Sequence, residues 1–126
     1  MSDQGHTYLK THRLKGSVLA FAARREAAAL ELSAAYLRSG RTARTLVNDG
    51  RLGVEVVALR KGASMARHRA KGSVSVHVLR GRLRVATAVG PTDLGPGGLV
   101  VLAPGVEHTV TARSDAAFLL TLAIPR

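Results

Sequence analysis

The chain has 126 residues, enough for one domain of ordinary size with its own core. Apolar residues make up 46% and aromatic residues only 3%, so the chain is not of the disordered class and its core must consist of Val, Leu and Ala. The absence of cysteine excludes disulfides, thiolate nucleophiles and cysteine-ligated metal sites. We expect a cytoplasmic protein, because the first residues also lack the unbroken apolar segment of a secretory signal.

The formal net charge is +11, from 19 Lys and Arg against 8 Asp and Glu. Such a charge can indicate nucleic-acid binding, because clustered guanidinium groups neutralise phosphates. Here the basic residues are spread along the chain, with no dense block and no interleaved aromatic residues for base stacking. We therefore expect no nucleic-acid partner, and attribute the charge to small anionic ligands or to a solvated basic surface. No apolar run approaches the roughly eighteen residues that a membrane span needs, so no membrane contact is expected.

The first 44 residues are predicted to precede the β-strand domain in the sequence and to differ from it in structure. Residues 1–16 have few apolar side chains and no periodicity, which predicts a flexible N-terminal arm. Residues 17–44 are predicted as an N-terminal helical segment, because 22–38 is rich in Ala, Leu, Arg and Glu and lacks Gly and Pro. Three apolar residues of this stretch recur at helical spacing: Leu30, Ala34 and Leu37. We expect one α-helix that packs on the body or on a second copy.

Residues 45–126 change to short apolar alternations separated by glycine, which predicts strands. The expected strands are Gly53–Leu59, Ser64–His68, Ser73–Leu79, Arg82–Ala88, Leu99–Leu102, His108–Thr111 and Ala117–Ile124. Turn signals lie between them, including "VGP" at 89–91 and "GPGG" at 95–98. The pattern predicts an all-β sandwich or small barrel.

Two pieces of this region resemble the two motifs of the cupin superfamily. The first family motif reads Gly, five residues, His-x-His, three or four residues, Glu, six residues, Gly. Here the matching positions are Gly62, His68, Ala70, Val74 and Gly81. The second reads Gly, five residues, Pro-Gly, two residues, His, three residues, Asn, and is matched by Gly98, Pro104, Gly105, His108 and Ala112. The resemblance covers most of residues 45–124 and implies an RmlC-like jelly-roll barrel, or double-stranded β-helix, preceded by the helix.

The resemblance also implies a metal site, because cupins commonly bind a metal through two histidines and a glutamate of the first motif and one histidine of the second. His68 and His108 occupy two of these positions. Ala70 and Val74 occupy the other two, and neither side chain can donate a lone pair to a divalent ion. We therefore expect either no cofactor or a loosely bound divalent metal, Fe, Mn, Ni or Zn, at His68 and His108.

Strand alternation predicts which neighbouring side chains enter the barrel. Val74, Val76 and Val78 should face inward, which puts His77 on the other face unless a bulge intervenes. Glu107 is predicted to be a solvated loop acid. Four arginines are predicted to face outward: Arg67, Arg69, Arg82 and Arg84.

These residues favour a small-molecule-binding cupin, with His68 and His108 near the mouth of an apolar cavity that includes Val74, Val76 and Val78. The alternative is a metal-dependent cupin enzyme of dioxygenase, isomerase or decarboxylase type, with His68 and His108 as ligands. A regulatory protein that uses its basic surface is a third class, but the sequence has no helix-turn-helix signature. Whether the chain is an enzyme is left open. A homodimer is expected, because cupins of this size commonly pair through their sheets.

Overall fold

The structure, a computed structural model, describes residues 18–125, except for the side chains of residues 66–68. The predicted arm at residues 1–16 lies outside the described residues. Two helices are followed by nine strands: α1 (Ala23–Glu31), α2 (Ala34–Ser39), β1 (Arg41–Asn48), β2 (Leu52–Leu59), β3 (Ser64–Arg69), β4 (Val74–Arg80), β5 (Leu83–Thr87), β6 (Gly90–Leu94), β7 (Leu99–Leu102), β8 (Glu107–Ala112) and β9 (Ala116–Ala123). Neither helix of this part of the chain is long and apolar enough to cross a membrane.

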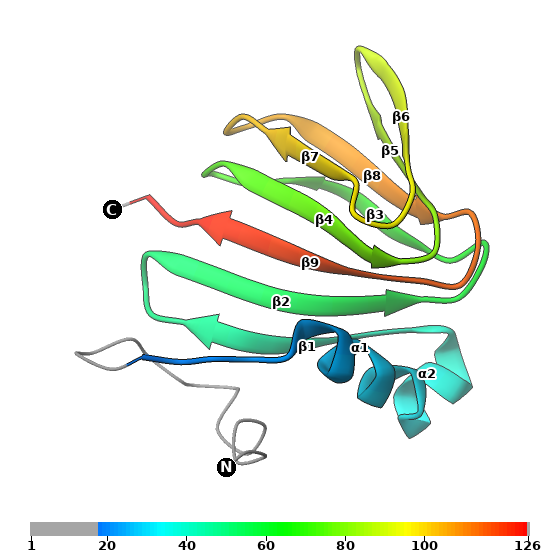
Figure 1. Cartoon of the computed structure of the whole chain (residues 1–126). Coiled ribbons are helices and arrows are strands. Elements are labelled where there is room, and N and C mark those ends of the chain that lie inside the picture. The colour runs from blue at the N-terminus through cyan, green and yellow to red at the C-terminus, as the bar shows by residue number, and fades with distance from the viewer. Residues whose placement is uncertain (1–17, 126) are drawn as a thin grey trace.

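The strands form two antiparallel sheets, one with the order β1-β2-β9-β4-β7 and the other with the order β3-β8-β5-β6. Figure 1 shows the sheets stacked as a sandwich, with both helices beside β1 and β2. Consecutive strands cross from one sheet to the other at several corners, such as the one between β8 and β9. The predicted all-β jelly-roll fold with a helical N-terminal part is confirmed.

The N-terminal part contains two short helices where the sequence predicted one. Ser33 separates them: it has extended backbone angles, and its hydroxyl accepts a hydrogen bond of 3.2 Å from the backbone N–H of Tyr36. This is the usual geometry of an N-terminal cap, so the chain begins a new helix here. The predicted stripe is accordingly wrong beyond the break, because Leu37 is exposed and Tyr36 is buried in its place.

The seven predicted strands agree with the structure to within one residue at each end, but two further strands were missed. β1 pairs with β2 along its whole length, so the sheet begins inside the segment predicted as helical. A bulge between Thr45 and Val47 buries both Leu46 and Val47, which hides the alternation of β1. β6 begins at Gly90 within the predicted "VGP" turn and pairs with β5.

Two apolar cores hold the fold together. The inner core lies between the sheets and includes the fully buried side chains of Phe118, Leu83, Val85 and Val110. Val74, Val76 and Val78 belong to it with at most 2% exposure, which confirms that they face inward. The outer core lies between α1 and the five-stranded sheet, and contains Ala27, Leu30, Val56 and Ala58. The helices thus cover part of the outer face of that sheet and leave the space between the sheets to the strands.

Candidate functional site

The sandwich has one end closed by backbone contacts. There, residues 60–63 lead from β2 to β3, the N–H of Gly62 donates to the carbonyl of Ala112 at 2.8 Å, and the N–H of Ala112 donates to Ala63 at 2.9 Å. We call this the closed end. At the opposite, open end, several apolar residues that contact the inner core are only half-buried: Ala70, Val100, Val106 and Leu122. A backbone hydrogen bond also joins loops at this end, from the N–H of Gly105 to the carbonyl of Ala70 at 2.8 Å, so the half-buried side chains alone mark it as the candidate entrance to the inner face.

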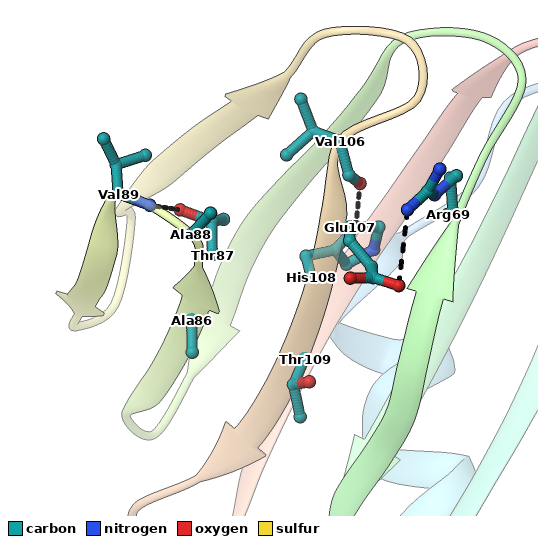
Figure 2. Close-up of a pocket in the computed structure, with 9 residues that line it drawn as sticks. All are labelled: Arg69, Ala86, Thr87, Ala88, Val89, Val106, Glu107, His108 and Thr109. Atoms are coloured by element: carbon teal, nitrogen blue, oxygen red, sulfur yellow. Dashed lines mark hydrogen bonds and ion pairs between the residues drawn. The ribbon is translucent and has the colours of Figure 1, made fainter.

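His108 lies at the open end on β8. Its side chain is 5% exposed, and its Nδ1 lies 3.0 Å from the carbonyl oxygen of Val106, as Figure 2 shows. Because a carbonyl oxygen only accepts, Nδ1 carries the proton of this hydrogen bond. The fold thus fixes the orientation of the ring.

His68 lies on β3, beside β8, and its backbone pairs in register with that of His108. The pairing is irregular between Met65 and His68. The imidazole of His68 is outside the described residues. The backbone therefore brings the two predicted histidine positions together at the open end.

The residues present do not fit the metal site that the family resemblance implies. Val74, at the position of the glutamate, is 2% exposed in the inner core, and Ala70, at the position of the second histidine, contacts the same core. Neither has a donor atom. Among the described residues, no group of three or more His, Cys, Asp or Glu could hold a metal ion.

A cavity of about 610 Å³ lies beside His108 (Figure 2). It is lined by Arg69, Ala86, Thr87, Ala88, Val89, Val106, Glu107, His108 and Thr109. Its polar groups include the hydroxyl of Thr87, which accepts a hydrogen bond of 3.3 Å from the N–H of Val89. The threonines were missed by the sequence analysis, because nothing local in the sequence shows that β5 ends beside His108.

Charged residues of the four-stranded sheet are paired with one another, including Arg69 and Glu107, which line this cavity. The sequence analysis predicted that Glu107 lies in a loop, but it is the first residue of β8. Its carboxylate lies 3.4 Å from the guanidinium of Arg69. Arg84 pairs with Asp93 at 2.7 Å, and this hydrogen bond holds the pKa of Asp93 below its usual range. Arg69 is well exposed, so the prediction that it faces outward is confirmed. The side chain of Arg67 lies outside the described residues.

His77 lies on the outer face of the five-stranded sheet. Its register partners are Leu99 on β7 and Leu119 on β9, and the pairing with β9 is regular from Val74 to Val78. The predicted alternation is therefore confirmed, and His77 does not enter the space between the sheets.

Glu55 on β2 was missed by the sequence analysis. Its neighbours Val54 and Val56 contact the outer core, whereas Val57 and Leu59 belong to the inner core. Because side chains of a strand alternate between faces, Glu55 faces inward with Val57. The signal was present as the single acidic residue within the apolar run "LGVEVVAL".

The chain has similarities to known structures. A protein of unknown function from Streptococcus pyogenes shares 28% identity and a TM-score of 0.65, over 68% of this chain and 75% of that chain. An RmlC-like cupin from Shewanella frigidimarina shares 21% identity and a TM-score of 0.64, over 69% and 78% of the two chains. A salicylate 1,2-dioxygenase from Pseudaminobacter salicylatoxidans shares 24% identity and a TM-score of 0.61, over 68% of this chain but only 26% of that chain.

The sequence comparisons identify a family rather than an individual relative. None of the curated proteins matches the sequence. The family model described as "Cupin domain" matches residues 55–124, which is more than half of the chain and includes both predicted motifs from His68 to Ala112. Together with the jelly-roll arrangement of the sheets, this match shows that the chain belongs to the cupin domain family.

Proposed function

We propose that the chain binds a small organic molecule at the open end of its barrel, in the cytoplasm, a compartment that the lack of cysteine favours. The observation that carries this proposal is the buried His108, whose imidazole is fixed by Val106 beside a cavity of about 610 Å³. A mostly apolar cavity with a few fixed polar groups is the usual composition of a ligand site. In this proposal, a bound ligand also reaches the inner core behind the cavity, where Val74, Val76 and Val78 form an apolar wall, and His68 and His108 orient the ligand by hydrogen bonds. The three valines do not line the cavity itself.

The alternative is a metal-dependent enzyme with His68 and His108 as ligands. The pairing of these two residues in register supports it, since it brings two histidines to neighbouring strands. The similarity to a salicylate 1,2-dioxygenase supports only the fold, at 24% identity. We favour the non-metal site, because Ala70 and Val74 remove two of the four donors, including the only anion.

Titration with cyclohexanol, followed by methyl NMR, tests the proposed site. We expect chemical shift changes at the inward Val74 and Val76 methyl groups, and little change at the outward Leu99 and Val101. His108→Ala should weaken binding by roughly three- to tenfold, the usual effect of losing one hydrogen bond. His77→Ala is the matched control and should leave the affinity unchanged, because His77 lies on the outer face. Shifts confined to Leu99 and Val101, or equal effects of the two histidine variants, would contradict the proposal.

We also propose that the chain forms a homodimer through the outer face of its five-stranded sheet. On β7 the side chains of Leu99 and Val101 are 57% and 64% exposed, and apolar groups of this kind are usually covered in an assembly. Light scattering at micromolar concentration should return twice the chain mass of 13.2 kDa. The double variant Leu99→Asp/Val101→Asp should return a single mass. A monomeric parent protein would rule out the dimer.

A further inference from the structure

Glu55 and His108 lie at the same level of the barrel. β2 and β8 both end at the closed end, where residues 60–63 bond to Ala112. Counted from there, the inward-facing positions are Leu59, Val57 and Glu55 on β2, and Ala112, Val110 and His108 on β8. Both residues thus occupy the third position, where Glu55 is half-buried and His108 is buried. Since stacked sheets lie about 10 Å apart, the two side chains approach the space between the sheets from opposite sides.

Glu55 differs from the other described acidic residues in having no partner within residues 18–125 as far as their side chains are described. Four of them form ion pairs with arginine: Glu26, Glu31, Asp93 and Glu107. The other two accept backbone N–H groups, from Arg51 and Leu52 to Asp49 and from Lys61 to Asp115. Within the described part of the chain, the Glu55 side chain forms no hydrogen bond and no ion pair. In a protein of net charge +11, this half-buried carboxylate has therefore not been neutralised by a basic side chain of that part.

The described neighbours of Glu55 on the adjacent strands are uncharged. Its register partners are Thr45 on β1 and Leu120 on β9, and Leu120 in turn pairs with Val76 on β4. A ligand that enters the open end would displace water from the carboxylate. A carboxylate only accepts hydrogen bonds, so a ligand without a donor would leave it dehydrated and unpaired, at a substantial free-energy cost.

We propose that Glu55 is a ligand-binding residue that selects small molecules carrying a protonated amino group. This inference rests on the function proposed above. An ammonium group would form a charge-assisted hydrogen bond with the carboxylate, which is stronger than one from a neutral donor. The selection depends on contact, because physiological salt screens the net charge of the protein beyond about 8 Å.

Three probes of equal size and different charge test this inference: cyclohexylammonium, cyclohexanol and cyclohexanecarboxylate at neutral pH. Affinities are measured from the methyl shifts of Leu120 and Val76. We expect the ammonium to bind most tightly and the carboxylate most weakly. Glu55→Gln should weaken ammonium binding about tenfold, as the loss of a charge-assisted hydrogen bond predicts, and should change cyclohexanol binding by less than about twofold. Glu31→Gln is the matched control and should leave all three affinities unchanged, because Glu31 lies on α1, away from the open end, and is held by Arg80.

The outcomes separate this inference from the proposed function. Equal binding of ammonium and cyclohexanol, or an unchanged ammonium affinity in Glu55→Gln, would overturn the role of Glu55 and leave small-molecule binding intact. If none of the probes shifted the inner methyl groups of the parent protein, both would fail. Broadening of the Leu120 signal by Mn²⁺ that competes with the ammonium, and that is lost in Glu55→Gln, would assign Glu55 to a metal instead and also overturn the inference.

Discussion

We expect Phe118→Ala to lower the free energy of unfolding by about 3–5 kcal/mol, the usual range for an aromatic residue removed from a core. Phe118 lies on β9, is fully buried, and is the largest fully buried side chain of the described residues. Its register partners are Val57 on β2 and Val78 on β4, so it lies on the central one of three adjacent strands and contributes to the inner core. The measurement is urea unfolding followed by circular dichroism.

A substitution at an exposed position serves as the control, because it removes a side chain of similar kind without removing buried contacts. Leu37 lies on α2 with 62% exposure, so Leu37→Ala should change the unfolding free energy by less than about 0.5 kcal/mol. If Phe118→Ala cost less than about 1 kcal/mol, or no more than Leu37→Ala, the inner core would not be the main source of stability.

The strands of the barrel could be predicted because their signals are local. Valine alternates with polar residues in "SVSVHVL", and glycine-containing turns separate the apolar runs. No bulge interrupts the pairing of Val74 to Val78 with β9, so simple alternation placed His77 on the outer face. The missed elements lack these signals. The bulge of β1 buries two consecutive residues, and β6 is a short strand that reads as a turn because it begins with "GP".

The helix break shows the limit of propensity. The stretch from Ala22 to Arg38 has no Gly or Pro, so its composition favours a single helix. Ser33 caps a second helix instead, and this lets both Leu30 and Tyr36 contact the outer core. Tertiary packing, which the local sequence does not contain, decides between the two arrangements.

The candidate site was predictable only in part. The motif resemblance located His68 and His108, and the structure pairs their backbones in register. Glu55 and Thr87 could not be assigned to the open end from the sequence. Their positions along the barrel depend on how β2 pairs with β9 and how β5 pairs with β8. Such long-range pairings are not visible in either strand alone. The acid within "LGVEVVAL" was nevertheless a signal that alternation could have used.

The central claim is that this cupin site orients an organic ligand rather than holding a resident metal. His68 and His108 are two of the four donors that the family resemblance implies, and Ala70 and Val74 supply none. Two imidazoles and water bind a divalent ion far more weakly than a set that includes a carboxylate, and a net charge of +11 repels a dication. We therefore expect the metal content of the purified protein to be well below one ion per chain.

Elemental analysis after expression in medium supplemented with Fe, Mn, Ni and Zn tests this claim most directly, on the parent protein and on the double variant His68→Ala/His108→Ala. The melting temperature of the double variant checks that it is folded. We expect substoichiometric metal in the parent and no measurable difference in the variant. One tightly held metal ion per chain, lost in the double variant, would contradict the account and make the metal-dependent enzyme the better interpretation.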